Sequence, residues 1–338
     1  MNEGSPSKSK HRWLRRTAWS FAILWACAFA AVAAMTFAQA WSMTHYQPAT
    51  VRSTRLGELS GWGRARLLCC GPAIRRQSNT QTPRDFGMAF ETRYFPGAHG
   101  LRIEAWRIAA PGGAPVVLMF PGYGASKDTL LYAAREFAAL GCAMWVVDPH
   151  GVGGSEGAVT SVGFHEAEDV AATFREACRV DAGRPVILYG PSMGAVAILR
   201  AVSEGWVKPD ALVIECPFDR FTTTIGNRYE WLGLPRFPFA PMVAFWVGAQ
   251  QGFNGLAHNP VEYARHVTCP ALLLQGEFDE SVGRRFVGEV AHSLSRGARF
   301  QLIPGAGHAF LVTRAEKVWR GSVTGFMKTI PRGKTPGL

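Results

Sequence analysis

The five residues from Gly190 to Gly194 constrain the fold of this chain more than any other segment. They read G-P-S-M-G, and they join an apolar, strand-forming run at 186–189 to an apolar, helix-forming run at 195–199. The pattern G-x-S-x-G between a strand and a helix is typical of a sharp turn that lifts a serine clear of the sheet edge. We therefore expect Ser192 to act as a nucleophile and Met193 to present its backbone N–H to an oxyanion.

Two polar residues follow later strand-like runs. Asp279 comes just after an apolar run at 271–276, and His308 lies in a loop after a weakly alternating run at 298–303. One helix-like stretch separates the two runs, so both residues fall at the carboxyl ends of parallel strands, where open α/β sheets place their sites. A serine needs a base within hydrogen-bond reach, and a carboxylate holds that imidazole in one tautomer. The pattern predicts a triad of Ser192, His308 as the base and Asp279 as the acid.

Two assignments in this predicted site have competitors. Glu277 and Glu280 lie close enough in the sequence to replace Asp279 as the acid. A glycine-rich turn follows the apolar run at 116–120, and it is expected to bring the backbone N–H of Tyr123 to the oxyanion as a second donor. The alternative for this turn is an ordinary connection between a strand and a helix.

Strand-like and helix-like segments alternate along most of the chain. Strands are predicted near 91–95, 101–108, 116–120, 143–148, 186–190, 211–215, 271–276 and 298–303. Helices are predicted near 127–140, 164–178, 193–204, 282–294 and 310–329. Alternation of this kind predicts an α/β fold, with a mostly parallel eight-stranded sheet covered by helices on both faces. The first two strands are expected to form a hairpin.

In these motifs the chain resembles the α/β-hydrolase superfamily, and within it the serine-aminopeptidase-like and BEM46-like hydrolases. The resemblance runs from about residue 90 to residue 330, and it rests on the serine turn and on the segments 121–124, 148–157, 277–279 and 307–308. It implies the α/β-hydrolase fold and a serine nucleophile. The chain departs from the family at His150, where an arginine is usual. The position of His150 in its motif implies a structural role and not that of a second base.

The resemblance and the predicted triad together imply a serine hydrolase that cleaves an ester, a thioester or an amide through an acyl-enzyme. A carboxylesterase- or lipase-like activity on an apolar acyl substrate is the leading interpretation. A serine aminopeptidase is an alternative, because Glu215 or Asp219 near the lid offers a carboxylate for a substrate ammonium. A catalytically idle fold that serves as a binding module is the alternative from another class. The sequence contains no H-E-x-x-H or C-x-x-C pattern, so we expect no metal and no cofactor.

Residues 217–262 interrupt the alternation with a segment rich in proline and aromatic residues. We expect this segment to form a lid over the serine. An apolar lid favours an apolar acyl or alkyl group in the substrate. The alternative is that these aromatic side chains only pack the lid onto the body.

The amino-terminal part of the chain is of a different kind. Residues 1–16 form a basic cluster, and residues 17–43 contain no charged side chain. That length is enough for one transmembrane helix, followed by a basic linker at 44–89 and a hydrolase domain at 90–338. The alternative is a cleavable signal peptide and a secreted protein, since Ala38-Gln39-Ala40 fits the A-x-A cleavage pattern.

Charge is concentrated in this amino-terminal part. Residues 1–90 hold 12 Lys and Arg against 3 Asp and Glu, whereas the rest holds 24 against 22, so we expect no nucleic-acid partner. Five basic residues precede the span, and only Arg52 and Arg55 follow closely, which favours a cytoplasmic amino end and an exported catalytic domain. The cysteines point weakly the other way, because four of the seven fall in expected core elements, as buried thiols would. These four are Cys142, Cys178, Cys216 and Cys269.

Overall fold

The computed structural model describes residues 7–48, 50–51, 60–279, 284–294, 298–308 and 311–330. An eight-stranded sheet lies at its centre, with the strand order β1-β2-β4-β3-β5-β6-β7-β8. The strands are β1 Glu91–Pro96, β2 Arg102–Ile108, β3 Val116–Met119, β4 Ala143–Asp148, β5 Val186–Pro191, β6 Ala211–Glu215, β7 Ala271–Gly276 and β8 Arg299–Ile303. β2 is antiparallel to both β1 and β4, and the other pairs are parallel. The predicted sheet is confirmed.

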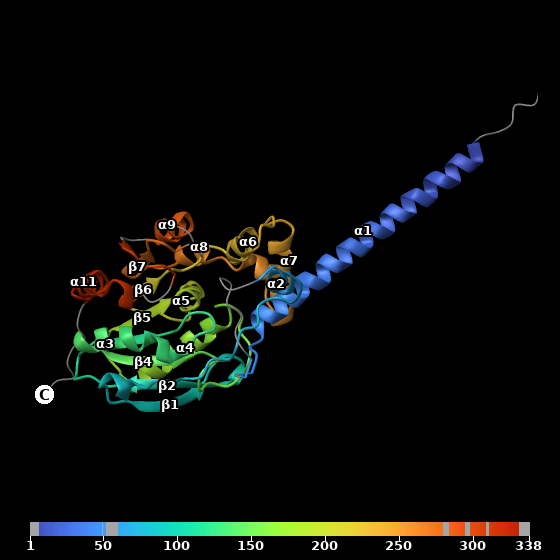
Figure 1. Cartoon of the computed structure of the whole chain (residues 1–338). Coiled ribbons are helices and arrows are strands. Elements are labelled where there is room, and N and C mark those ends of the chain that lie inside the picture. Colours follow the sequence, from blue (N-terminus) through green and yellow to red (C-terminus); the bar gives the residue numbers. More distant parts are fainter. Residues whose placement is uncertain are drawn as a thin grey trace, which may run out of the picture.

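Helices cover both faces of the sheet (Figure 1). One face packs against α3 Leu131–Ala139 and α11 Glu316–Met327, and the other packs against α4 Glu166–Val180, α5 Met193–Ser203 and α9 Arg284–Ser293. Side chains alternate between the two faces along β3, where Val116 and Leu118 enter one core and Val117 and Met119 enter the other. Both faces are buried, which explains why the central strands read as continuous apolar runs rather than alternating ones.

The segment predicted as a lid folds as a group of helices. They are α6 Phe221–Trp231, α7 Phe239–Gln251, a 3₁₀ turn at Gly255–Ala257 and α8 Pro260–Ala264. α7 packs against both α6 and the amino-terminal helix α1, Ser7–Thr44. The lid therefore joins the body to α1.

α1 projects away from the body as one long helix (Figure 1). Its stretch from Arg12 to Thr44 is long and apolar enough to cross a membrane. Side chains along 12–31 are almost all exposed, whereas the last turns are buried against the body, with Thr36 and Ala40 fully inaccessible. The helix is longer than the predicted span of 17–43 because the basic segment before it is also helical from Ser7 onward.

The segment expected to be a basic linker packs on the body over its described part. Its short helix α2, Gly61–Cys70, contacts α1, and the Gln39 side chain donates a hydrogen bond to the Leu67 carbonyl. Arg76 donates to the carbonyl of Ser155 at 2.6 Å. Arg52 and Arg55, on which the topology argument depends, lie outside the described residues.

The cysteines only partly follow the expectation of buried thiols. Cys142 and Cys216 are buried, and Cys269 is half-buried. Cys178 is exposed near the end of α4, so its predicted burial is wrong. Ala167 and Ala171 lie on the same side of α4 as Cys178 and are buried, so the exposure of Cys178 goes with its place in the last turn of the helix.

Candidate active site

The turn between β5 and α5 holds Ser192 in an unusual backbone conformation. Its φ is 49° and its ψ is −114°, and its N–H donates to the Glu215 carbonyl at 2.8 Å. A Cβ on Gly190 would lie 2.7 Å from the backbone of Gly194, and a Cβ on Gly194 would lie 2.2 Å from the carbonyl oxygen of Phe120. Only glycine fits at these two positions, which is the physical reason for the G-x-S-x-G pattern.

The structure brings the three predicted triad residues into one chain of hydrogen bonds. The Ser192 hydroxyl donates to Nε2 of His308 at 3.0 Å, and Nδ1–H of His308 donates to Oδ2 of Asp279 at 2.8 Å. The Asp279 side chain is buried, and the Gln275 amide donates to the same oxygen at 2.9 Å. This order of donors leaves Nε2 free to accept a proton from the serine.

The competing acids take other positions. Oε2 of Glu277 accepts the backbone N–H of Gly305 at 3.1 Å, which holds the loop after β8. Glu280 lies outside the described residues. Of Asp279 and Glu277, it is Asp279 that bonds His308.

A cavity of about 470 Å³ opens beside the serine. Its wall is mostly apolar and includes Ser192, Met193, Tyr123, His308, Phe218, Phe221, Leu311 and Met43. Met193 is the first residue of α5, and the first N–H groups of a helix have no partner within it. The Tyr123 backbone lies in the turn after β3, and its hydroxyl donates to the Met43 carbonyl in the last turn of α1. The end of α1 therefore forms part of the cavity wall.

Glu215 also lines this cavity. Its Oε1 accepts hydrogen bonds from the Tyr189 hydroxyl at 2.9 Å and from the Trp319 indole at 2.6 Å. Burial raises the pKa of Glu215 to about 7, although the two hydrogen bonds act to lower it. Asp219, the other carboxylate considered for a substrate ammonium, is turned to Arg220 and Thr223 instead.

His150 lies in a buried group of charges. Its backbone N–H and its Nδ1–H both donate to Asp169, the latter at 2.6 Å, and Glu166 lies 4.0 Å from its Nε2. Burial acts to lower the pKa of His150, but the carboxylates of Asp169 and Glu166 outweigh it and raise the pKa to about 9. A histidine that is cationic at neutral pH cannot accept a proton, so this position stabilises the loop after β4.

Two groups of side chains offer the ligand types that Zn²⁺ accepts. One consists of Cys216, Asp279 and His308 and coincides with the hydrogen-bonded chain above. Sequence reasoning expected Cys216 to be a buried thiol but gave it no place in the site, and its φ of 46° directly after β6 could not be read from the sequence.

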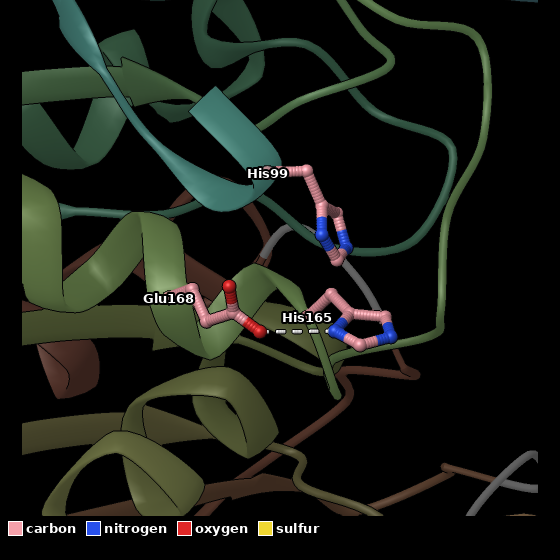
Figure 2. A group of neighbouring side chains, drawn as sticks. All are labelled: His99, His165 and Glu168. Atoms are coloured by element: carbon pink, nitrogen blue, oxygen red, sulfur yellow. Dashed lines mark hydrogen bonds and ion pairs between the residues drawn. The ribbon is translucent and has the colours of Figure 1, made fainter. Parts of the chain in front are cut away.

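The other group consists of His99, His165 and Glu168, whose ligand atoms lie within 4.8 Å of one another (Figure 2). Nδ1 of His165 lies 3.0 Å from the Glu168 carboxylate, and its Nε2 lies 2.8 Å from the Gln251 carbonyl. Both ring nitrogens of His165 thus already have oxygen partners, one on Glu168 and one on the backbone of Gln251. The contact of His165 with Gln251 joins the start of α4 to the carboxyl end of α7, and none of these residues lines the cavity.

Comparison with known proteins agrees with this geometry. The model of the family "Serine aminopeptidase, S33" matches residues 114–250, which include β3, the serine turn and part of the lid. The uncharacterised protein YqkD of Bacillus subtilis is 25% identical over 236 residues, which cover 69% of this chain and 77% of that protein. A lysophosphatidylserine lipase, ABHD12 of Danio rerio, is 24% identical over 206 residues, which cover 56% of this chain and 51% of the lipase. The chain thus spans about half the length of that relative.

The solved structures agree on the fold. The esterase Pf2001 of Pyrococcus furiosus superposes with a TM-score of 0.64 at 20% identity, over 75% of this chain and 96% of the esterase. At this level of identity the likeness concerns the fold. Taken with the strand order of the sheet and the serine turn, it shows that the chain has the α/β-hydrolase fold, and its central part matches the serine aminopeptidase family model.

Proposed function

We propose that this protein is a membrane-anchored serine hydrolase that cleaves carboxylic esters of apolar acyl groups. The observation that carries the proposal is the hydrogen-bonded chain Ser192–His308–Asp279 at the wall of a mostly apolar cavity. The size of the cavity suits a small ligand, since such sites measure about 300–1,000 Å³.

The geometry supports a two-step acyl transfer. Oγ of Ser192 attacks the substrate carbonyl carbon as Nε2 of His308 takes the hydroxyl proton, and the carbonyl oxygen becomes an oxyanion. The backbone N–H groups of Met193 and Tyr123 are the donors proposed for that oxyanion. The tetrahedral intermediate then collapses, the alcohol leaves with the proton from His308, and the acyl group stays on Ser192. Water, deprotonated by His308, attacks the acyl-enzyme and releases the acid.

The apolar wall and the two likenesses favour an ester over a peptide. One curated relative is named a lipase and one solved relative an esterase. The aminopeptidase alternative depends on Glu215, which would have to bind an ammonium group while its Oε1 already accepts two hydrogen bonds. Its raised pKa also leaves it only partly charged at neutral pH.

The experiment is a substrate series with the full-length protein in detergent. We expect hydrolysis of p-nitrophenyl esters to rise in kcat/KM from acetyl to medium-length acyl chains, because longer chains bury more apolar surface in the cavity. Aminoacyl p-nitroanilides are expected to be poor substrates. Faster hydrolysis of the anilides than of every ester would replace the esterase with the aminopeptidase.

Membrane anchoring through α1 is the second part of the proposal. The charge-free stretch that stands clear of the body, 17–31, is 15 residues long. It measures about 22 Å at 1.5 Å per residue, which is less than the hydrocarbon core of about 30 Å. The body must therefore sit against the bilayer, with the charge-free helix α7 beside α1 at its surface. The basic amino end favours a cytoplasmic amino terminus and an exported body.

Retention of α1 is favoured over its cleavage. The predicted cleavage position, Ala40, is fully buried, and cleavage there would detach Thr36 and Gln39 from the body. We expect the protein to stay with membranes after carbonate washing and to migrate near 36.8 kDa. Amino-terminal sequencing checks this directly, and a mature protein that begins at Trp41 would show that α1 is a signal peptide.

A further inference from the structure

A single basic side chain of arginine or lysine type lines the cavity within the described residues. It belongs to Arg228 of the lid helix α6, which shares the cavity wall with Ser192 and Tyr123. The neighbouring threonine on the same wall, Thr224, offers a hydroxyl one helical turn earlier. A guanidinium in the wall of a mostly apolar cavity is unusual, because charged side chains are seldom buried unless they are paired.

No carboxylate among the described residues forms an ion pair with the guanidinium of Arg228. Its Nη1 is buried and has no hydrogen-bond partner within the part of the chain that the structure describes. The other arginines around α6 are paired, Arg220 with Glu289 at 2.7 Å and Arg236 with Glu230 at 2.6 Å. An unpaired buried donor on a charged group destabilises the folded protein, so an acceptor that binds there recovers part of that free energy.

The charge of Arg228 reaches the site. Burial raises the pKa of the Tyr123 hydroxyl, and the positive charge of Arg228 acts against this rise. The cavity wall holds one carboxylate among its described residues, that of Glu215, and its Oε1 is occupied by Tyr189 and Trp319. Arg228 is the one arginine or lysine charge on the described wall of the cavity.

We propose that Arg228 is the subsite for an anionic group of the substrate. The substrate class is an amphipathic ester that carries a phosphate or a carboxylate near the scissile bond. Its acyl chain lies in the apolar part of the cavity, and the anionic oxygens accept hydrogen bonds from the Arg228 guanidinium, which matches phosphate and carboxylate geometry with two parallel donors. This inference rests on the proposed esterase activity and adds the charge of its substrate.

The test compares pairs of esters in which one member carries an anionic group and the other is neutral. The phosphate pair is 1-lauroylglycerol-3-phosphate against 1-lauroylglycerol, and the carboxylate pair is the lauroyl ester of glycolic acid against isobutyl laurate, so that the anionic group lies near the scissile ester in both pairs. We expect Arg228→Gln to lower kcat/KM for the anionic member about 10- to 100-fold, the range of a charge-assisted hydrogen bond. The neutral member is expected to change less than about 3-fold, and Arg228→Lys to retain part of the selectivity. The pair that shows the larger loss identifies phosphate or carboxylate as the group bound.

Arg265→Gln is the matched control. Arg265 is an exposed arginine at the end of α8, ion-paired with Glu262 at 2.6 Å, and it does not line the cavity. This variant is expected to keep the selectivity for the anionic member. An equal loss on the neutral and anionic esters in Arg228→Gln would overturn the proposal, since it would show that Arg228 only supports the lid.

A ligand-binding experiment that needs no catalysis tests this inference separately from the esterase proposal. In the background of Ser192→Ala, dodecyl phosphate is expected to raise the melting temperature more than dodecanol does, and Arg228→Gln is expected to remove the difference. If no ester is hydrolysed but this difference persists, the anion subsite stands and the esterase activity fails. If esters are hydrolysed and dodecyl phosphate stabilises no more than dodecanol, the anion subsite is refuted and the esterase activity stands.

Discussion

Replacing Ser192 with alanine is expected to lower ester hydrolysis about 10⁶-fold, the loss seen when the nucleophile of a serine triad is removed. The physical reason is that Oγ of Ser192 is the atom proposed to attack the carbonyl, and His308 has no other hydroxyl to activate in the described site. The folded state should persist, because alanine keeps the Cβ that the positive φ of 49° already tolerates and adds no bulk. Labelling by a fluorophosphonate, which reacts with the same Oγ atom, is measured together with the turnover of the ester.

Ser322→Ala provides the control for this experiment. Ser322 is on the outer helix α11 and donates to the Val318 carbonyl, far in the sequence from the turn and not on the cavity wall. It is expected to leave labelling unchanged. Full labelling of a folded Ser192→Ala protein would refute the assignment of the nucleophile, and labelling of neither the variant nor the wild type would favour the idle binding module.

Much of the fold follows from the sequence because local signals and packing agree. The eight strands appear within two residues of their expected bounds, since buried parallel strands require apolar runs of four to six residues between turns. The turn at Ser192 is equally predictable, because contacts of 2.2 and 2.7 Å forbid side chains at Gly194 and Gly190. Asp279 and His308 follow from the same rule, which places site residues just after parallel strands.

The features that the sequence did not predict depend on contacts between segments that are distant in the sequence. The burial of Thr36 and Met43 in the body cannot be read from a uniformly apolar run, which looks the same whether its neighbour is lipid or protein. The linker interpretation of 44–89 failed to foresee the packing of α2 for a similar reason, since its contacts with α1 are made in three dimensions. From the sequence alone, Arg228 on the lid helix would be expected to face solvent, whereas the structure places it on the wall of the cavity.

The contact between α1 and Tyr123 gives this helix a place in the proposed chemistry. The Tyr123 hydroxyl is bonded to the last turn of α1, while its backbone N–H is a proposed oxyanion donor. The position of the Tyr123 N–H donor therefore depends on how α1 packs against the body. This is a physical reason for an anchor that is retained, because a cleaved chain would lose most of the helix that holds Met43 in place.

Replacing Asp279 with asparagine is expected to lower kcat about 10⁴-fold, as in other serine triads. The buried carboxylate accepts the Nδ1–H of His308 at 2.8 Å, and this bond keeps Nε2 free to accept the serine proton. An asparagine amide can donate to Nδ1 instead, which favours the tautomer with a proton on Nε2, and it lacks the charge that stabilises the imidazolium. Glu277→Gln is the matched control and is expected to cost less than about 10-fold, because Glu277 is bonded to the Gly305 backbone and not to His308. Steady-state kinetics on folded variants decides between the two carboxylates: if Glu277→Gln loses as much activity as Asp279→Asn, the acid has been misassigned.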